Sequence, residues 1–188
     1  MIAILFAAAV TLETVLPLCD QFLEKAGVTL DKPIAKAVSK SIVHAEQENA
    51  TIILQDRYVL GYWREAVREF WDRAENVNHK LSRLDPAEMV AWSKQPCLLD
   101  ERTAVEVGLK YFHGLGFKDE DFEPPECHQY RWQPSETNPT HVLTVPAFHI
   151  QWMRKGAREN EHGFGPKIVM AISGATKRLV YFSSLSLR

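Results

Sequence analysis

The chain has 188 residues, of which 46% are hydrophobic and 24% charged, and its formal net charge is −2. This composition is ordinary for a globular protein with a buried core, and the length fits one domain or two small ones. Acidic and basic residues are interspersed and form no basic stripe, so we expect no binding to nucleic acid.

An apolar run, Ile2–Val10, precedes the first charged residue of the chain. It is too short to span a bilayer, which takes about 20 residues, so we expect no integral membrane span. Its length and small residues are typical of the apolar region of a signal peptide, although no Lys or Arg precedes it. We therefore assign residues 1–14 to a signal or targeting segment and expect a periplasmic or secreted protein. A buried first helix in a cytoplasmic protein is the alternative.

The first half of the chain, residues 15–81, predicts a helix followed by strands. Apolar residues recur at helical spacing up to a stop at Gly27, which predicts a helix over about 15–26. Segments rich in β-branched and aromatic residues predict the strands that follow. These strands are expected over residues 35–44, 51–54, 58–63 and 67–71.

A linker, residues 82–97, separates the two halves. Its sequence Asp85-Pro86-Ala87-Glu88 combines an N-cap acid, a proline at the first helical position and a capping-box glutamate. This pattern predicts a short helix over about 86–93.

The second half, residues 98–188, repeats the order of the first. Asp100 is a natural N-cap for a helix with one broad apolar face, which Gly114 and Gly116 end. Strands are expected over residues 127–132, 141–153, 167–173 and 178–183. The matching order predicts an α+β protein of two similar units, each a helix packed on a small antiparallel sheet.

The two helix ends, QFLEKAGV at 21–28 and YFHGLGF at 111–117, are followed in the second half by the closing sequence KIVMAISGATKRLVYFS at 167–183. Together they resemble the PepSY-like and cystatin-like small α+β folds, in which a helix lies across a curled antiparallel sheet. The second half is also similar to uncharacterised exported bacterial proteins with a tandem arrangement. The resemblance implies an exported protein whose modules bind or inhibit other proteins or peptides, and it implies no catalytic residue.

Within the long strand 141–153, alternation separates an inward from an outward set of side chains. The side chains expected to face the helix over 101–115 are Leu143, Val145, Phe148, Ile150 and Trp152. The first two share this face only if Pro146 breaks the alternation. His149 and Gln151 are expected to face away.

The histidines and cysteines show no metal-ligand spacing: the sequence contains neither HExxH nor CxxC, and no two histidines lie four residues apart. Asp119, Asp121 and Glu123 alternate in one loop, but the glycine and the glutamate of an EF-hand loop are missing. We therefore expect no metal site and no cofactor. Cys97 and Cys127 could form a disulfide only if the loop 117–126 ran back along the helix.

The sequence also lacks a recognisable catalytic set. The motif Gly-x-Ser-x-Gly is absent, and Ser173-Gly174 belongs to a predicted hairpin turn. Cys127 and His128 are neighbours in a predicted strand, so their side chains point to opposite faces. We therefore predict no catalytic residue, and His149 is the first candidate should the protein prove to be an enzyme.

These observations favour a non-enzymatic, exported protein that binds a protein or peptide, with an inhibitory role included. Binding would use strand addition at a sheet edge or the seam between the halves. The alternative is a small hydrolase or ligand-binding protein with a site at that seam. A seam pocket that holds buried titratable groups would favour the alternative, and a long exposed strand edge would favour the binding protein.

Overall fold

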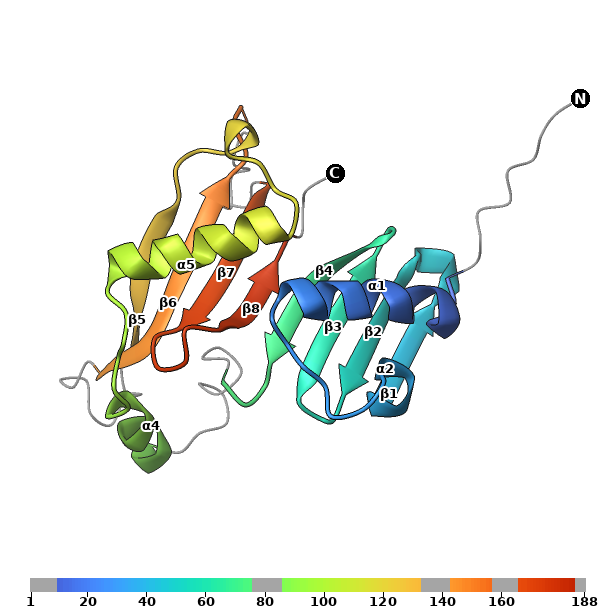
Figure 1. Cartoon of the computed structure of the whole chain (residues 1–188), viewed down its shortest axis with the longest axis horizontal. Helices are drawn as coiled ribbons and strands as arrows, with labels where there is room; N and C mark the ends of the chain where they lie inside the picture. Colours follow the sequence, from blue (N-terminus) through green and yellow to red (C-terminus); the bar gives the residue numbers. More distant parts are fainter. Residues whose placement is uncertain (1–9, 76–85, 133–142, 157–165, 185–188) are drawn as a thin grey trace, which may run out of the picture.

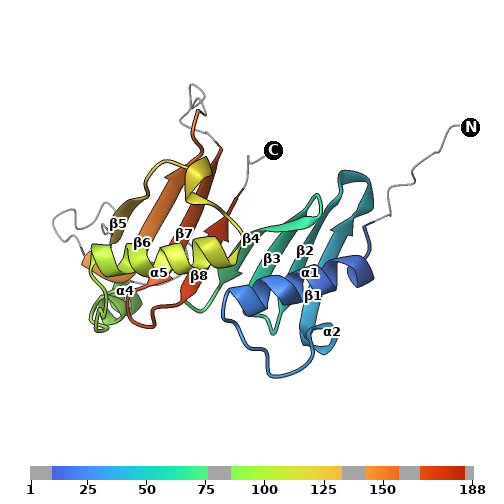
Figure 2. The same cartoon turned by 45° about the horizontal axis from the view of Figure 1, so that its top comes forward.

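The structure, a computed structural model, describes residues 10–75, 86–132, 143–156 and 166–184. The protein is α+β: its strands form one antiparallel sheet of eight strands in the order β1-β2-β3-β4-β8-β7-β6-β5. The strands are β1 (Val38–His44), β2 (Asn49–Leu54), β3 (Tyr58–Trp63), β4 (Ala66–Asp72), β5 (Glu126–Trp132), β6 (Leu143–Met153), β7 (Lys167–Ser173) and β8 (Leu179–Ser183). The helices are α1 (Leu12–Lys25), α2 (Ile34–Ala37), α4 (Pro86–Ser93) and α5 (Glu101–Gly114), with 3-10 turns η1 (Ala45–Gln47) and η2 (Asp119–Asp121). Helices α1 and α5 lie on the same face of the sheet (Figures 1 and 2).

Helix α1 begins earlier than the expected start at residue 15. Thr11 is its N-cap and forms a reciprocal capping box with Thr14. Pro17 therefore lies inside the helix and not in its first turn. The buried face of α1 consists of Val15, Cys19, Phe22 and Leu23.

The other elements follow the predicted order closely. The strand expected over 35–44 starts at Val38, because residues 34–37 form the short helix α2. Helix α4 has the bounds predicted for the linker helix. Asp100 caps α5, and its side chain accepts a hydrogen bond of 2.7 Å from the backbone N–H of Thr103.

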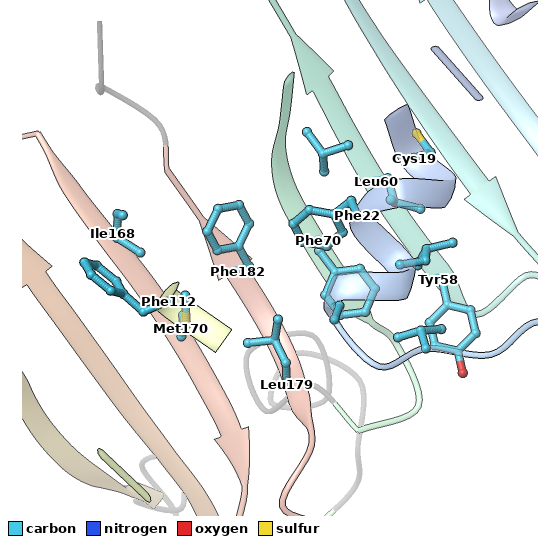
Figure 3. Close-up of a cluster of buried hydrophobic side chains, with 14 of the residues drawn as sticks. Cys19, Phe22, Tyr58, Leu60, Phe70, Phe112, Ile168, Met170, Leu179 and Phe182 are labelled. Carbon is cyan, nitrogen blue, oxygen red and sulfur yellow. The ribbon is translucent and has the colours of Figure 1, made fainter. Parts of the chain in front are cut away.

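The two groups of four strands join through antiparallel pairing of β4 with β8, where Phe70 lies opposite Phe182. The small sheets expected from the sequence are thus parts of one continuous sheet. Phe22 of α1 packs over this junction, with its ring centroid 5.6 Å from that of Phe70 and 5.3 Å from that of Phe182. Figure 3 shows these rings between the apolar side chains of both groups, including Leu60 and Met170. The buried residues on this face form one core.

Strand β6 is irregular around Pro146, where its pairing with β5 passes from Gln129↔Phe148 to Arg131↔Thr144, as expected for a proline that cannot donate to the ladder. Phe148, Ile150 and Trp152 are buried in the core beneath α5, as predicted, and His149 and Gln151 are half-buried on the other face. The expectation for Val145 is wrong. Val145 and Ala147 are buried in a separate cluster with Met89 and Trp92 of α4. Leu143 is half-buried and belongs to neither cluster.

Replacement of Trp152 by alanine should cost about 3–5 kcal/mol of unfolding free energy. The side chain is 1% exposed, and its ring centroid lies 4.8 Å from that of Phe112 in a stacked pair. Urea unfolding measures the change, and Thr144→Val on the exposed surface of the same strand is the control. A loss below about 1 kcal/mol would mean that this strand does not supply the core beneath α5.

The shared core predicts that both halves of the sheet unfold together. Amide hydrogen exchange at Leu60 in β3 and at Met170 in β7 should report the same free energy of opening, because both residues are fully buried in one cluster. Two clearly different free energies would show that the junction between β4 and β8 opens before either core.

Candidate functional site

Strand β1 is one of the two edges of the sheet. Five of its seven residues are exposed, and Ile42 leaves 43% of its surface open to solvent. The strand contains no proline, and its one Lys or Arg, Lys40, lies at the end where the register is bulged. The opposite edge, β5, carries the charged residues Glu126 and Arg131. Charges blunt a strand edge against pairing, so β1 is the more open of the two edges.

The register shows which backbone groups of β1 face away from β2. The backbone N–H of Arg64 donates to the carbonyl of Glu48, where the pairing of β2 with β3 begins. Hydrogen-bonded pairs in an antiparallel ladder recur at every second residue, so Ala50 bonds to β3, and Asn49 and Thr51 bond to β1. Their partners in β1 are His44 and Ile42. The N–H and C=O groups of Ser41 and Val43 therefore point outward from the sheet, where a further strand could pair with them.

A hollow of about 450 Å³ lies on the sheet face opposite α1. Its lining residues are His44, Gln47, Asn49, Ala50, Thr51, Gly61, Tyr62, Trp63, Arg68 and Glu69. Gly61 lies between Thr51 and Glu69 in the cross-strand register and leaves the floor without a side chain. Burial raises the pKa of the Glu69 carboxyl above its ordinary value.

A second pocket, of about 250 Å³, lies at the seam between α1, β4, β8 and the segment after α5. Its residues are Leu18, Gln21, Phe22, Lys25, Glu65, Ala66, Val67, Arg68, Leu115, Phe117, Phe182 and Ser184. This lining contains no His, Cys or Asp, and its ionisable side chains Lys25, Glu65 and Arg68 are exposed or half-buried. The Ser184 hydroxyl is buried and has no hydrogen-bond partner among the described residues. None of these lining residues is a base placed to activate it, so the described part of the seam offers no buried titratable group of the kind that a hydrolase uses.

His149, the candidate named from the sequence, lies on β6 directly opposite His128 of β5. Burial lowers the pKa of His149, and the charges of Lys167 and His128 lower it further. The ring centroid of Tyr130 lies 5.8 Å from that of His149. None of the described pockets includes His149. We therefore attribute the partial burial of His149 to its neighbours on the sheet surface and not to a binding pocket.

The cysteines are free thiols. Cys127 packs against the core while His128 is exposed, so the two side chains lie on opposite faces as predicted. Burial raises the pKa of Cys127 to about 11 and that of Cys19 to about 12. Cys97 is exposed, and its Sγ donates to the carbonyl of Leu99 at 3.2 Å. Two of the three thiols are thus poor nucleophiles at neutral pH.

The acidic loop does not gather its carboxylates. Asp119 Oδ1 lies 3.0 Å from His113 Nε2, and Lys155 Nζ donates to the backbone carbonyls of Asp119 and Glu120. Within residues 10–75, 86–132, 143–156 and 166–184, no three His, Cys, Asp or Glu side chains converge as metal ligands would. His141 and His162 lie outside the described residues.

No protein-family model matches the sequence, and no curated protein matches it. One solved structure that resembles the chain is the "Bacillus megaterium YpeB C-terminal domain", with 11% sequence identity and a TM-score of 0.49. The match covers 95% of this chain and 64% of that one, so the chain spans less than two thirds of the neighbour's length. This similarity is too low to assign a fold family or a function. In the described part of the chain, no helix has both the length and the apolar character needed to cross a bilayer.

Replacement of Glu69 by glutamine should stabilise the protein at pH 7. The pKa of Glu69 is raised on folding, so the folded state holds its proton more tightly than the unfolded state. Stability therefore falls as the pH rises from the unfolded pKa, about 4.3, through the folded pKa. The gain at pH 7 should be less than about 1 kcal/mol, because the side chain is partly solvated.

Urea unfolding of both proteins at pH 7 and at about pH 3.5 measures this difference, which should vanish at the lower pH. The exposed Glu46→Gln variant is the control and should match the wild type at both pH values. A loss of stability in Glu69→Gln at pH 7 would show that the carboxylate has a stabilising partner.

Proposed function

We propose that the protein is a non-enzymatic module that binds an extended segment of another protein, which adds a strand to the sheet beside β1. The observation that carries the proposal is the open edge of β1, where Ser41 and Val43 direct their backbone groups away from the sheet. In strand addition, such groups supply the affinity and the alternating side chains supply the specificity. An inhibitory role is part of the proposal, since an added strand can block the partner that provides it.

A second protein is a better occupant of this edge than a second copy of the chain. Antiparallel pairing of two copies centred on Ile42 would place Lys40 of each copy opposite His44 of the other. Lysine on an edge strand is a common device against self-association. A partner that offers an apolar or acidic side chain opposite Lys40 meets no such cost.

We also propose that the chain is a tandem of two similar units over residues 15–81 and 98–188, joined by the linker 82–97. Each unit would be a helix followed by four strands. In the chain, α1 precedes β1–β4 and α5 precedes β5–β8, which agrees with this proposal. The four strands of each unit are neighbours in the sheet. From the junction, the order is β4-β3-β2-β1 on one side and β8-β7-β6-β5 on the other. The PepSY-like or cystatin-like identity of these units, and export through the segment 1–14, rest on the sequence features described above.

The test uses a display library of random peptides selected on the wild-type protein. Ser41→Pro removes an outward N–H from an exposed residue, and Ser41→Thr is the matched control that keeps this N–H and the hydroxyl. We expect the selected peptide to bind Ser41→Pro about tenfold or more weakly, because the variant loses one hydrogen bond and the proline ring obstructs the added strand. Ser41→Thr should stay within about threefold of the wild type.

Hydrogen exchange provides the second readout. The peptide should slow exchange of the Ser41 and Val43 amides and leave those of β5 unchanged, and urea unfolding should show that Ser41→Pro remains folded. Equal affinity of the proline and threonine variants would exclude strand addition at β1. A concentration-dependent dimer that Ser41→Pro abolishes would identify a second copy as the occupant and overturn the proposed partner.

A further inference from the structure

In the hollow on the sheet face opposite α1, the side chain of Glu69 lies close to Gly61. A Cβ at this position would lie 3.1 Å from Cβ and 3.3 Å from Oε2 of Glu69. The Glu69 side chain therefore folds over the bare backbone of Gly61. A side chain at residue 61 would force Glu69 to shift by a few tenths of an ångström, so the glycine permits this close approach.

The Glu69 carboxylate has no counter-charge there. Among the described residues it forms no hydrogen bond or ion pair, although its side chain is half-buried. Arg64, a nearby cation of the chain, pairs with Glu48 at 3.7 Å. Arg68 also lines the hollow but forms no ion pair with Glu69. A partly desolvated anion without a partner is costly, and a bound cation would offset this cost.

Trp63 supplies an aromatic wall to the same hollow. Its side chain is 36% exposed, which is unusual for so large an apolar group. The Arg64 guanidinium carbon lies 5.4 Å from the Trp63 ring centroid, so this ring already attracts a cation. An aromatic ring and an uncompensated carboxylate that line one hollow are a suitable environment for an ammonium or guanidinium group.

We propose that this hollow binds the cationic side chain of a lysine or arginine from a ligand protein or peptide, with its charged group beside Glu69 and Trp63. The volume of about 450 Å³ is sufficient for one such side chain. This site lies on the face of the sheet and uses residues of β2, β3 and β4. It is independent of strand addition and would stand if the edge of β1 bound nothing.

Titration followed by NMR tests the proposal with three small probes: Nα-acetyl-lysine amide, Nα-acetyl-arginine amide and the uncharged Nα-acetyl-norleucine amide. The indole N–H signal of Trp63, assigned with Trp63→Phe, and the amide signal of Gly61 report on the hollow. We expect saturable shifts of both signals with the two cationic probes and none with the norleucine probe. Added salt should weaken binding, because the attraction is electrostatic.

Two substitutions separate this site from general attraction to an acidic surface. Glu69→Gln, which is nearly isosteric, should weaken binding of the cationic probes at least about tenfold, as removal of a charge partner requires. Glu46→Gln removes an exposed charge that does not line the hollow and should leave the affinity within about twofold. Equal binding to the wild type and Glu69→Gln, or shifts as large with the norleucine probe, would overturn the proposal.

Discussion

The pairing of β4 with β8 is the contact on which the rest of the structure depends. It places Phe70 opposite Phe182 and lets Phe22 pack over both, so the apolar residues beneath α1 and α5 form one core. It also removes an inner edge from each group of four strands. The sheet is left with two edges, β1 and β5, and its unpaired backbone groups lie along them. The contact that stabilises the core thus also decides where another strand can bind.

Local signals in the sequence were sufficient for most of the elements. The Asp100 cap, the Pro86 start of α4 and the alternation around Trp152 each depend on residues close together in the chain, and the structure confirms them. Apolar spacing alone starts α1 at about residue 15, whereas the Thr11–Thr14 capping box sets the start at Leu12. The single sheet could not be predicted, because the register between β4 and β8 joins residues far apart in the sequence.

Long-range contacts also explain what the sequence did not reveal about binding. The sequence pattern predicts Val145 beneath α5, but α4 covers the other face of β6 and buries Val145 there, and nothing near Pro146 in the sequence indicates this packing of α4. Glu69 is one of 24 acidic residues and by itself predicts a solvated side chain. Its burial comes from Gly61 on the neighbouring strand, so it appears only when the cross-strand register is known. A glycine inside a predicted strand was the available signal for a close approach of another group.

The two halves of the sheet therefore differ in what they offer to a partner. In the second half, Met89 and Trp92 of α4 cover the outer face of β6 and bury Val145 and Ala147. In the first half, the corresponding face carries the hollow over Gly61, and the open edge of β1 lies on the same four strands. A ligand that uses both features would contact residues of β1–β4 alone. The second half would then act by supplying β8, which closes the inner edge of β4 and holds the first sheet in a register that exposes these features.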